Sequence, residues 1–238
     1  MLKNAIGYFK AQTYKSRELI IVSLGDDPLY ERFIYSQTDC IIKYFPIRDR
    51  GNLTLGELRN IAIEKAKGEY ICIWDDDDWY HNRRIELQMQ ETLRSKKMGT
   101  ILPYCILYNS IKRKSYMSII ATPPASIFCK RAVISKELLY PHLNFAEDAS
   151  FMKKLFHRSF LYPVINPTLY VYKFHGSNSI DLDHFNSLCS HEFSPAVNRL
   201  ICDVIDHKFT YEEASEIMSS RKVLVEIDYF KNLINTIN

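Results

Sequence analysis

The sequence predicts an α/β fold in which a mainly parallel sheet is flanked by helices. Over the first two-thirds of the 238 residues, short apolar runs alternate with amphipathic segments. This alternation is typical of parallel strands that are connected by helices. The composition agrees, because 47% hydrophobic and 25% charged residues are ordinary values for a globular protein. From about residue 181 onward the apolar residues recur at helical spacing, so we expect a helical C-terminal tail.

The first predicted elements alternate between helix and strand. Residues 2–11 are expected to form a short helix. The run ELIIVS at 18–23 is expected to form a strand buried on both faces, because it is continuously apolar. A second helix is expected over residues 29–36 and a second strand over 41–45.

The clearest helix signal follows these elements. Thr54 and Glu57 have the spacing of a capping box, and Gly68 is expected to end the helix. The next strand, YICIW at 70–74, runs directly into four aspartates, Asp75 to Asp78. In open α/β sheets ligands bind beyond the carboxyl ends of the strands, so this acidic run lies where a site is expected.

The rest of the chain supplies further elements. A helix is expected over 83–96, several strands within 99–130, a helix from Asn144, and a last strand over 168–174. The final helix, 222–238, places its apolar residues in a narrow seam. This seam favours packing on the domain over an oligomer contact.

Charge and cysteine usage exclude several classes of protein. A net charge of +3 is too weak to predict a nucleic-acid partner, although it suits an anionic lipid or substrate. No stretch approaches the ~20 apolar residues that span a bilayer, and no signal peptide pattern is present. The six cysteines include no Cys-x-x-Cys pair, so we expect a reduced, cytoplasmic protein with free thiols. The basic cluster at 112–114 is interpreted as a solvated turn, with contact to anionic lipid as the alternative.

The acidic run needs compensation, because adjacent carboxylates repel one another unless a cation lies near them or some are protonated. A hard divalent cation fits oxygen ligands of this kind, so Mg²⁺ or Mn²⁺ held against a diphosphate is one interpretation. A solvated acidic turn is the other. The buried run before the aspartates, and the bracketing Trp74 and Trp79, favour the metal site.

The stretch LGELRNIAIEKAKGEYICIWDDDDW resembles the central part of family 2 glycosyltransferases with the GT-A fold. That family carries an Arg-Asn pair, then Ala-x-Gly-x-Tyr, then a strand ending in Asp-x-Asp-Asp. NFAEDASF, which contains Glu147-Asp148, matches the family's Glu-Asp motif, and HGSNS at 175–179 resembles its His-containing loop. These motifs lie in the family's order over residues 1–180, which we expect to form a GT-A-like domain, with 181–238 as a helical extension.

The resemblance implies a role for each matching residue at the acidic end. Asp75 and Asp76 lie where the family contacts the uridine of the donor, and Arg59 where a basic side chain approaches the nucleotide. Asp77 lies where the family binds the Mn²⁺ or Mg²⁺ that bridges the diphosphate, with His175 as a further ligand. Taken alone, Arg59 would be an ordinary solvated helix residue, and His175 would be a weak signal.

The Glu-Asp pair has two interpretations. The resemblance implies that Asp148, with Glu147 beside it, is the catalytic base of an inverting enzyme. The alternative is local, because Glu147 follows Asn144 by three residues and matches a capping box. Asp148 would then be a first-turn carboxylate favoured by the helix dipole. The resemblance favours catalysis for Asp148, while Glu147 could serve both purposes.

The sequence departs from the family near its start. Family members begin with an extra strand and a loop that grips the uracil, whereas residues 2–11 resemble the helix after that loop. We therefore expect a gap inside the sheet, with unpaired backbone groups unless another segment covers them. The family's second strand also ends in Asp-Asp-Gly-Ser, where this chain has Ser23-Leu24-Gly25-Asp26. Ser23 is thus the candidate nucleotide contact there. A misplaced start codon, a truncated remnant and a rearranged fold all remain open.

The resemblance implies transfer of a sugar from a nucleotide sugar, with a UDP-sugar favoured, to a glycan or lipid-linked acceptor. Such acceptors of surface polysaccharide and lipopolysaccharide synthesis are assembled at the inner membrane face, so we expect a cytoplasmic enzyme with peripheral membrane contact. One alternative is a catalytically silent protein with a binding or scaffold role, which the absent first strand favours. A metal-dependent phosphoryl enzyme is disfavoured, because no Gly-rich phosphate loop is present.

Overall fold

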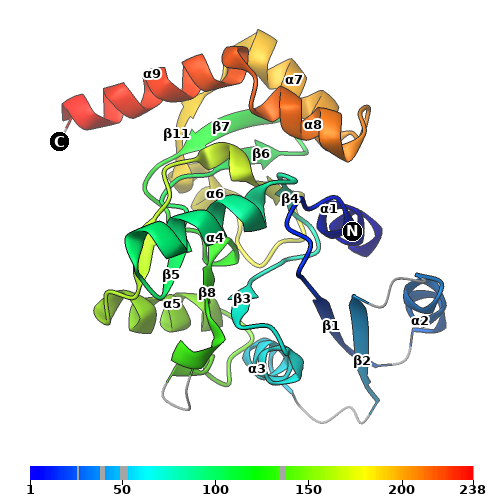
Figure 1. Cartoon of the computed structure of the whole chain (residues 1–238). Coiled ribbons are helices and arrows are strands. Elements are labelled where there is room, and N and C mark those ends of the chain that lie inside the picture. Colours follow the sequence, from blue (N-terminus) through cyan, green and yellow to red (C-terminus); the bar gives the residue numbers. More distant parts are fainter. Residues whose placement is uncertain (26, 38–40, 49–52, 135–137, 238) are drawn as a thin grey trace.

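The computed structural model of the chain contains the predicted alternation of helices and strands (Figure 1). It describes residues 1–25, 27–37, 41–48, 53–134 and 138–237, with side chains up to residue 232. The helices are α1 (Leu2–Lys10), α2 (Pro28–Tyr35), α3 (Leu55–Lys65), α4 (Arg84–Ser95), α5 (Glu147–His157), α6 (Leu182–Leu188), α7 (Pro195–Ile205), α8 (Tyr211–Met218) and α9 (Arg221–Ile237). The strands are β1 (Leu19–Leu24), β2 (Ile42–Ile47), β3 (Tyr70–Cys72), β4 (Trp79–Tyr80), β5 (Gly99–Ile101), β6 (Ile106–Asn109), β7 (Lys114–Ser118), β8 (Phe128–Lys130), β9 (Leu161–Pro163), β10 (Tyr170–Phe174) and β11 (Cys189–Glu192).

The described strands form three sheets, so the expectation of one mainly parallel sheet is wrong in this respect. Their orders are β1-β2, β3-β8-β5-β9 and β11-β7-β6-β10-β4. Among the described strands three ladders are parallel and five are antiparallel. The reason is connection length: β6 and β7 are joined by a short turn, which only an antiparallel pair allows. The predicted α/β class itself is confirmed.

The helix that carries Arg59 begins as predicted. Thr54 Oγ1 accepts a hydrogen bond from the Glu57 amide, and the Glu57 carboxylate accepts one from the Thr54 amide at 2.8 Å. This capping box fixes the first turn of α3. The helix ends at Lys65, before the predicted stop at Gly68.

Strand β1 is only half-buried, which corrects the expected burial on both faces. Residues 19–23 are all partly exposed, and Leu24 is 46% exposed. The cause is that β1 pairs with β2 on one side and faces a cavity on the other. The expected gap inside the sheet is therefore confirmed, and it lies between β1 and β3. Asp26 lies outside the described residues.

Stacked aromatic rings fix the end of β3. The ring of Trp74 stacks on Tyr80 with centroids 4.0 Å apart, and its Nε1 donates to the Ala5 carbonyl at 3.2 Å. The guanidinium of Arg84 lies 4.7 Å from the Tyr80 centroid and 5.3 Å from that of Trp74. Helix α1, strand β4 and helix α4 thus converge on the residue directly before the acidic run.

The C-terminal helices α7, α8 and α9 cover the upper part of the molecule in Figure 1. Val223 and Ile227 are fully buried and Phe230 is 6% exposed, so the seam of α9 packs on the domain as predicted. The side chains of Ile234 and Ile237 lie outside the described part. The tail also contributes a strand, β11, to the sheet through β7, which the sequence did not predict. The division at residue 180 stays a prediction.

A buried histidine connects this tail to the start of α4. His81 Nε2 donates to the Ser215 carbonyl at 3.0 Å, and its Nδ1 accepts from the Arg83 amide at 3.0 Å. Burial lowers the pKa of His81 to about 4, although the hydrogen bond to Ser215 opposes this shift. The imidazole is therefore neutral near pH 7.

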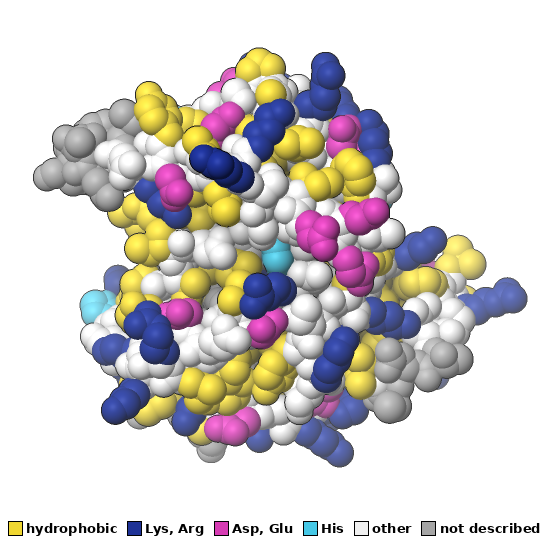
Figure 2. Space-filling view, turned by 45° about the horizontal axis from the view of Figure 1, so that its top comes forward, with side chains coloured by type: hydrophobic (Ala, Val, Ile, Leu, Met, Phe, Trp, Pro, Cys, Tyr) yellow, Lys and Arg dark blue, Asp and Glu magenta, His cyan; other side chains and the backbone are white. Residues whose placement is uncertain are grey.

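The surface and the thiols agree with the compositional predictions. Figure 2 shows Lys and Arg side chains interspersed with Asp and Glu over the face that it presents. The cluster at 112–114 is exposed: residues 112 and 113 lie in the turn before β7 and Lys114 begins that strand, with Arg113 paired to Asp206 at 2.6 Å. The five cysteines in the described part are free thiols, and Cys40 lies outside it. None of the helices described for this chain has the length and apolarity needed to cross a bilayer.

Candidate active site

One cavity of about 1600 Å³ brings most of the predicted site residues together. It extends from the space beside β1 to the end of β3, the start of α5 and the loop after β10. The predicted residues that line it are Ser23, Arg59, Asp75, Asp76, Asp77, Glu147 and Asp148. His175 is not a lining residue, but it contacts Asp77.

The first two aspartates of the run lie at the cavity wall. Asp75 Oδ1 accepts from Arg59 Nη1 at 3.2 Å, and the Asp75 amide donates to the Tyr80 hydroxyl at 2.7 Å. The Tyr80 hydroxyl thus fixes the turn that follows Trp74. Asp76 is exposed, and partial desolvation followed by the charge of Asp77 raises its pKa above the ordinary value.

Asp77 is the meeting point of the acidic run and the HGSNS loop. His175 Nε2 lies 3.2 Å from Asp77 Oδ2, and Asn178 Nδ2 donates to the same oxygen at 3.4 Å. Asn178 also accepts from the His175 amide at 2.7 Å and donates to the Lys173 carbonyl at 2.9 Å. The loop is therefore fixed so that imidazole and carboxylate face each other.

These two groups are suitable ligands for a divalent cation. A carboxylate oxygen together with an imidazole nitrogen suits Mn²⁺ well, and Mg²⁺ sites commonly use one or two carboxylates plus substrate phosphates. Within the described residues no group of three or more His, Cys, Asp or Glu side chains is placed to bind a metal. The pair of Asp77 and His175 therefore fits a cation only if a ligand such as a diphosphate completes the coordination.

Asp78 differs from its three neighbours, because it is 2% exposed. Its Oδ2 accepts from the Tyr170 hydroxyl at 2.5 Å and its Oδ1 from the Lys173 amide at 2.9 Å. Burial, followed by the charge of Asp77, raises the pKa of Asp78 well above its ordinary value. Asp78 is thus a structural link between β4 and β10. All four aspartates border the cavity, but Asp78 alone is buried, while the other three are partly or fully exposed.

Arg59 joins two predicted site residues. Its Nη1 lies 3.2 Å from Asp75 Oδ1 and its Nε 3.2 Å from Glu147 Oε1. Its guanidinium also lies 5.7 Å from the Tyr140 ring centroid. Burial alone would lower the pKa of Arg59, but the carboxylates of Asp75 and Glu147 outweigh it and raise that pKa. The solvated-helix interpretation of Arg59 is therefore wrong.

The local capping interpretation of Glu147 is also wrong. Helix α5 begins at Glu147 itself, after Ala146 in the left-handed conformation (φ 58°) without a side-chain cap. The Asn144 Oδ1 accepts instead from the Leu55 amide at 2.9 Å, at the start of α3. Glu147 is 3% exposed and bound to Arg59, so it is closed to an acceptor substrate.

Asp148 is the accessible member of the Glu-Asp pair. It is half-buried in the first turn of α5 and lines the cavity, with its Oδ1 accepting from the Ala149 amide at 2.6 Å. Its other oxygen is available to a substrate hydroxyl. Ser23 also lines the cavity, but its hydroxyl lies 2.7 Å from the Tyr44 hydroxyl and is already hydrogen-bonded.

Two residues that the sequence analysis missed lie beside this site, although neither lines the cavity. Lys173 lies near Asp76, Asp77 and Asp78; burial lowers its pKa, while these three charges oppose that shift. A strand places residues i and i+2 on one face, so its position two residues before His175 was a usable signal. Gly56 is the second, since a Cβ there would lie 1.9 Å from the Pro141 carbonyl oxygen. Only glycine lets α3 approach the segment before α5 this closely.

Comparison with known proteins agrees with this geometry. The model of glycosyl transferase family 2 matches residues 1–148, which is more than half of the chain. The chain belongs to glycosyltransferase family 2. The resemblance of its motifs to this family is thereby confirmed.

Similar proteins and solved structures show how much of their length this chain covers. An uncharacterized glycosyltransferase of Rickettsia typhi is 30% identical over 143 residues, which cover 60% of this chain and 42% of that protein. One of Rickettsia conorii is 34% identical over 80 residues, covering 33% of this chain and 13% of the relative. The chain thus spans less than half of the length of these relatives. The crystal structure of S. aureus TarS superposes with a TM-score of 0.53 at 12% identity, over 91% of this chain and 39% of that one. This likeness confirms the GT-A fold.

Proposed function

We propose that this chain transfers a sugar from a nucleotide sugar, preferably a UDP-sugar, to a hydroxyl group of a glycan or lipid-linked acceptor. The observation that carries the proposal is the convergence of three aspartates, Arg59 and Asp148 on one cavity, with His175 bound to Asp77. Family membership supports transferase chemistry, and the residues of the cavity suit its two substrates.

The donor side lies at the end of β3. Asp75 and Asp76 carry carboxylate oxygens that accept hydrogen bonds from ribose hydroxyls and the uracil imide. Asp77 and His175 would bind Mn²⁺ or Mg²⁺. A cation bound there neutralises the charge of a diphosphate and so improves it as a leaving group. Lys173, close to the same aspartates, supplies a further positive charge for the phosphates.

The acceptor side lies at the start of α5. Asp148 acts as the general base, because it lines the cavity and can take the proton of the attacking hydroxyl. Attack opposite the diphosphate inverts the anomeric centre. Arg59 and Glu147 position this machinery, since their ion pair ties the start of α5 to Asp75.

Exposed aromatic side chains support a large acceptor. Phe145 is 62% exposed and Phe156 is 44% exposed, and both line the cavity beside Asp148. Flat apolar rings of this kind suit the faces of sugar rings or a lipid chain. We propose surface polysaccharide or lipopolysaccharide synthesis as the setting, with a cytoplasmic enzyme that contacts the inner membrane face peripherally.

Calorimetric titration of UDP into the full chain, with and without Mn²⁺, tests the donor half. Binding that requires both Mn²⁺ and Asp77 is expected, with Asp77→Asn as the test variant and the exposed Asp228→Asn as the matched control. Equal binding by Asp77→Asn would refute the metal assignment. For the base, Asp148→Asn is expected to bind UDP normally while lowering sugar transfer by about 10²–10⁴-fold, the usual worth of a general base.

A catalytically silent binding or scaffold protein is the second candidate. Two observations favour it: the open space beside β1, and the Ser23 hydroxyl, which is already bonded to Tyr44. In that case a folded chain would show no UDP binding at any Mn²⁺ concentration. The same titration therefore separates the two candidates.

A further inference from the structure

The side of α5 that borders the cavity carries a row of apolar side chains. Ala149, Met152 and Phe156 line the cavity, and their spacing of three and four residues places them on one side of the helix. Phe145, two residues before the helix begins, lines the same cavity. Phe145 and Phe156 both stay exposed. Large apolar side chains that remain exposed in a cavity indicate a binding surface.

Two charged residues of α5 also border the cavity, in a fixed order along the helix. Asp148 and Lys153 are both lining residues. At a rise of about 1.5 Å per residue, Lys153 lies about 7.5 Å beyond Asp148 along the helix axis, and Phe156 lies about 12 Å beyond it. A ligand bound along this helix therefore meets a carboxylate, then a cation, then an aromatic ring. The spacing between the carboxylate and the cation leaves room for one sugar ring.

The charge of Lys153 is unmatched within the described part of the chain. Its side chain is exposed and forms neither a hydrogen bond nor an ion pair with the described residues. The neighbouring Lys154 instead donates to the Leu139 carbonyl at 3.2 Å and does not line the cavity. The other Lys and Arg side chains that line the cavity contact carboxylates or backbone carbonyls: Arg17, Arg59 and Lys130. Lys153 is therefore available to an anionic group of a ligand.

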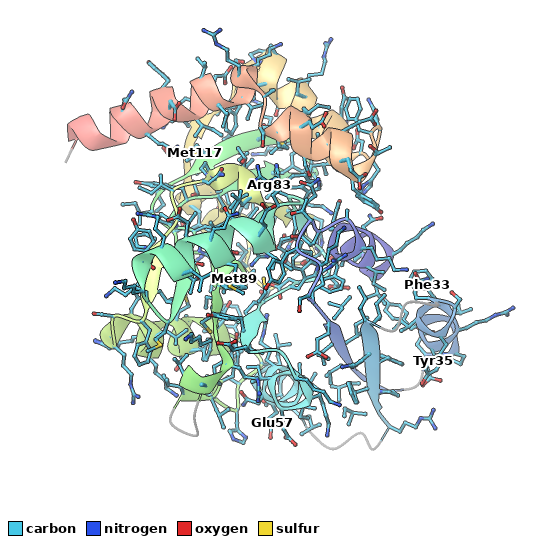
Figure 3. All side chains as sticks on the ribbon, viewed as in Figure 1. Phe33, Tyr35, Glu57, Arg83, Met89 and Met117 are labelled. Atoms are coloured by element: carbon cyan, nitrogen blue, oxygen red, sulfur yellow. The ribbon has the colours of Figure 1, made fainter. Side chains whose placement is uncertain are left out.

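The segment before α5 is held against α3. The Gly56 amide donates to the Leu143 carbonyl at 3.0 Å. Glu57, which is labelled on α3 in Figure 3, has its Oε1 3.0 Å from Nδ1 of His142. These contacts fix the start of α5, so the order of carboxylate, cation and ring is already set before a ligand binds. Such preorganisation favours binding.

The neighbouring wall of the cavity is largely apolar as well. The short helix η1 (Pro124–Ser126) packs against α5. None of the described lining residues within 121–125 and 178–188 is acidic, so this wall does not repel an anion. Two exposed isoleucines, Ile119 and Ile120, precede it and extend the apolar surface. The apolar lining residues of the wall include Pro123, Pro124, Ile180 and Leu188.

We propose that the acceptor bound along α5 is a sugar joined through a phosphate to an apolar chain. The sugar lies beside Asp148, the phosphate binds Lys153 and the chain contacts Phe156. This inference rests on the proposed function, because it takes Asp148 as the base for the acceptor hydroxyl. A neutral glycan would leave the charge of Lys153 unused, and a water-soluble sugar phosphate would leave the apolar row without contact. A sugar phosphate with an apolar chain uses the carboxylate, the cation and the apolar surface together.

Three small probes separate the phosphate from the chain. Octyl glucosyl phosphate carries a sugar, a phosphate and an apolar chain. Octyl glucoside lacks the phosphate, and glucose 1-phosphate lacks the chain. Each probe is titrated by calorimetry into the full protein, below the concentration at which it forms micelles. Because the proposal assigns recognition to the phosphate and the chain, the identity of the sugar in the probe is secondary.

Variants with matched controls locate the binding surface. Lys153→Met removes the cation, and Lys153→Arg keeps it. Lys222→Met is the control for the charge, because Lys222 is also exposed but lies on α9 and does not line the cavity. Ala149→Trp fills the middle of the apolar row. His157→Trp adds the same ring at an exposed position of α5 that does not line the cavity.

We expect 1:1 binding of octyl glucosyl phosphate, and binding at least about tenfold weaker for each of the other two probes. Lys153→Met and Ala149→Trp should each weaken binding of the complete probe by at least about tenfold. Lys153→Arg, Lys222→Met and His157→Trp should leave that binding unchanged.

Absence of binding by octyl glucosyl phosphate would overturn the proposal, and so would normal binding to Lys153→Met. Equal binding of octyl glucoside would overturn it in favour of a neutral acceptor, and equal binding of glucose 1-phosphate in favour of a water-soluble one. UDP titration of the same sample reports on the proposed function separately. Binding of UDP without the probe would refute only the acceptor assignment, whereas binding of the probe without UDP would refute only the donor half of the proposed function.

Discussion

Replacing Arg59 by an uncharged residue should destabilise the protein, because the buried carboxylate of Glu147 would lose its ion-pair partner. In Arg59→Met the carboxylate of Glu147, whose side chain is 4% exposed, would lose its ion-pair partner. Removing one partner of a buried pair costs roughly 3–5 kcal/mol. Because Arg59 itself is 21% exposed, the lower end applies. Asp75 is 31% exposed and adds less than about 1 kcal/mol.

We therefore expect Arg59→Met to lower the free energy of unfolding by about 3 kcal/mol. For a chain of this size that corresponds to a fall in Tm of roughly 6–12 °C. Urea denaturation followed by tryptophan fluorescence measures the loss. Arg83→Met is the matched control, because the Arg83–Glu86 pair is 49% and 28% exposed and spans one helical turn. Its removal should cost at most about 0.5 kcal/mol.

A double variant isolates the cause. Replacing both charges, as in Arg59→Met with Glu147→Leu, leaves no buried carboxylate unpaired, so it should be more stable than Arg59→Met alone. The reasoning is refuted if Arg59→Met behaves like Arg83→Met. It is equally refuted if the double variant is no more stable than the single one.

Three further predictions follow from the same structure. Gly56→Ala should destabilise the protein by about 1–3 kcal/mol and weaken UDP binding, because the new Cβ would meet the Pro141 carbonyl. Thermal denaturation measures the stability and calorimetry measures the UDP binding. An unchanged Tm would contradict this prediction. Asn144→Ala should cost about 1 kcal/mol by removing the acceptor for the Leu55 amide; urea denaturation measures it, and no change would mean that water replaces the side chain. The pKa of His81 is about 4 when folded, below the ordinary unfolded value, so the unfolded state binds more protons between about pH 6.5 and pH 4 and stability falls as pH decreases through that window. Between pH 7 and pH 4.5 the His81→Gln variant should lose about 2–3 kcal/mol less unfolding free energy than the parent chain. Urea denaturation at a series of pH values measures this difference. If the unfolding free energies of the two proteins fall in parallel with pH, His81 is not the cause.

Local signals in the sequence were sufficient for many of the helices and strands and for several residues that the fold brings to one cavity. The capping box of Thr54 and Glu57, and the apolar run before Asp75, depend on neighbours a few residues away, so they could be predicted from spacing. The motif resemblance likewise placed Asp77 and His175 together before any geometry was known, and their atoms lie 3.2 Å apart.

The different roles of the residues within these motifs could be assigned only from the tertiary structure. Four identical aspartates look equivalent in a sequence, yet Asp78 is buried and hydrogen-bonded to Tyr170, while the other three keep exposed surface. Glu147 matches a capping box by spacing, but its carboxylate binds Arg59, 88 residues away. Such differences depend on which distant groups exclude water from each carboxylate, and spacing carries no information about that.

The pairing of the strands could likewise be predicted from the sequence only in part. An apolar strand at 18–23 and a gap beside it were both predictable, because they follow from the pattern of that segment and its departure from the family. Whether other strands would close the gap depended on pairings between residues far apart in the chain. The structure leaves the gap open between β1 and β3, and β8, β5 and β9 continue the sheet only on the far side of β3. Strand pairing is a long-range choice among competing edges, so it is decided by the assembled fold.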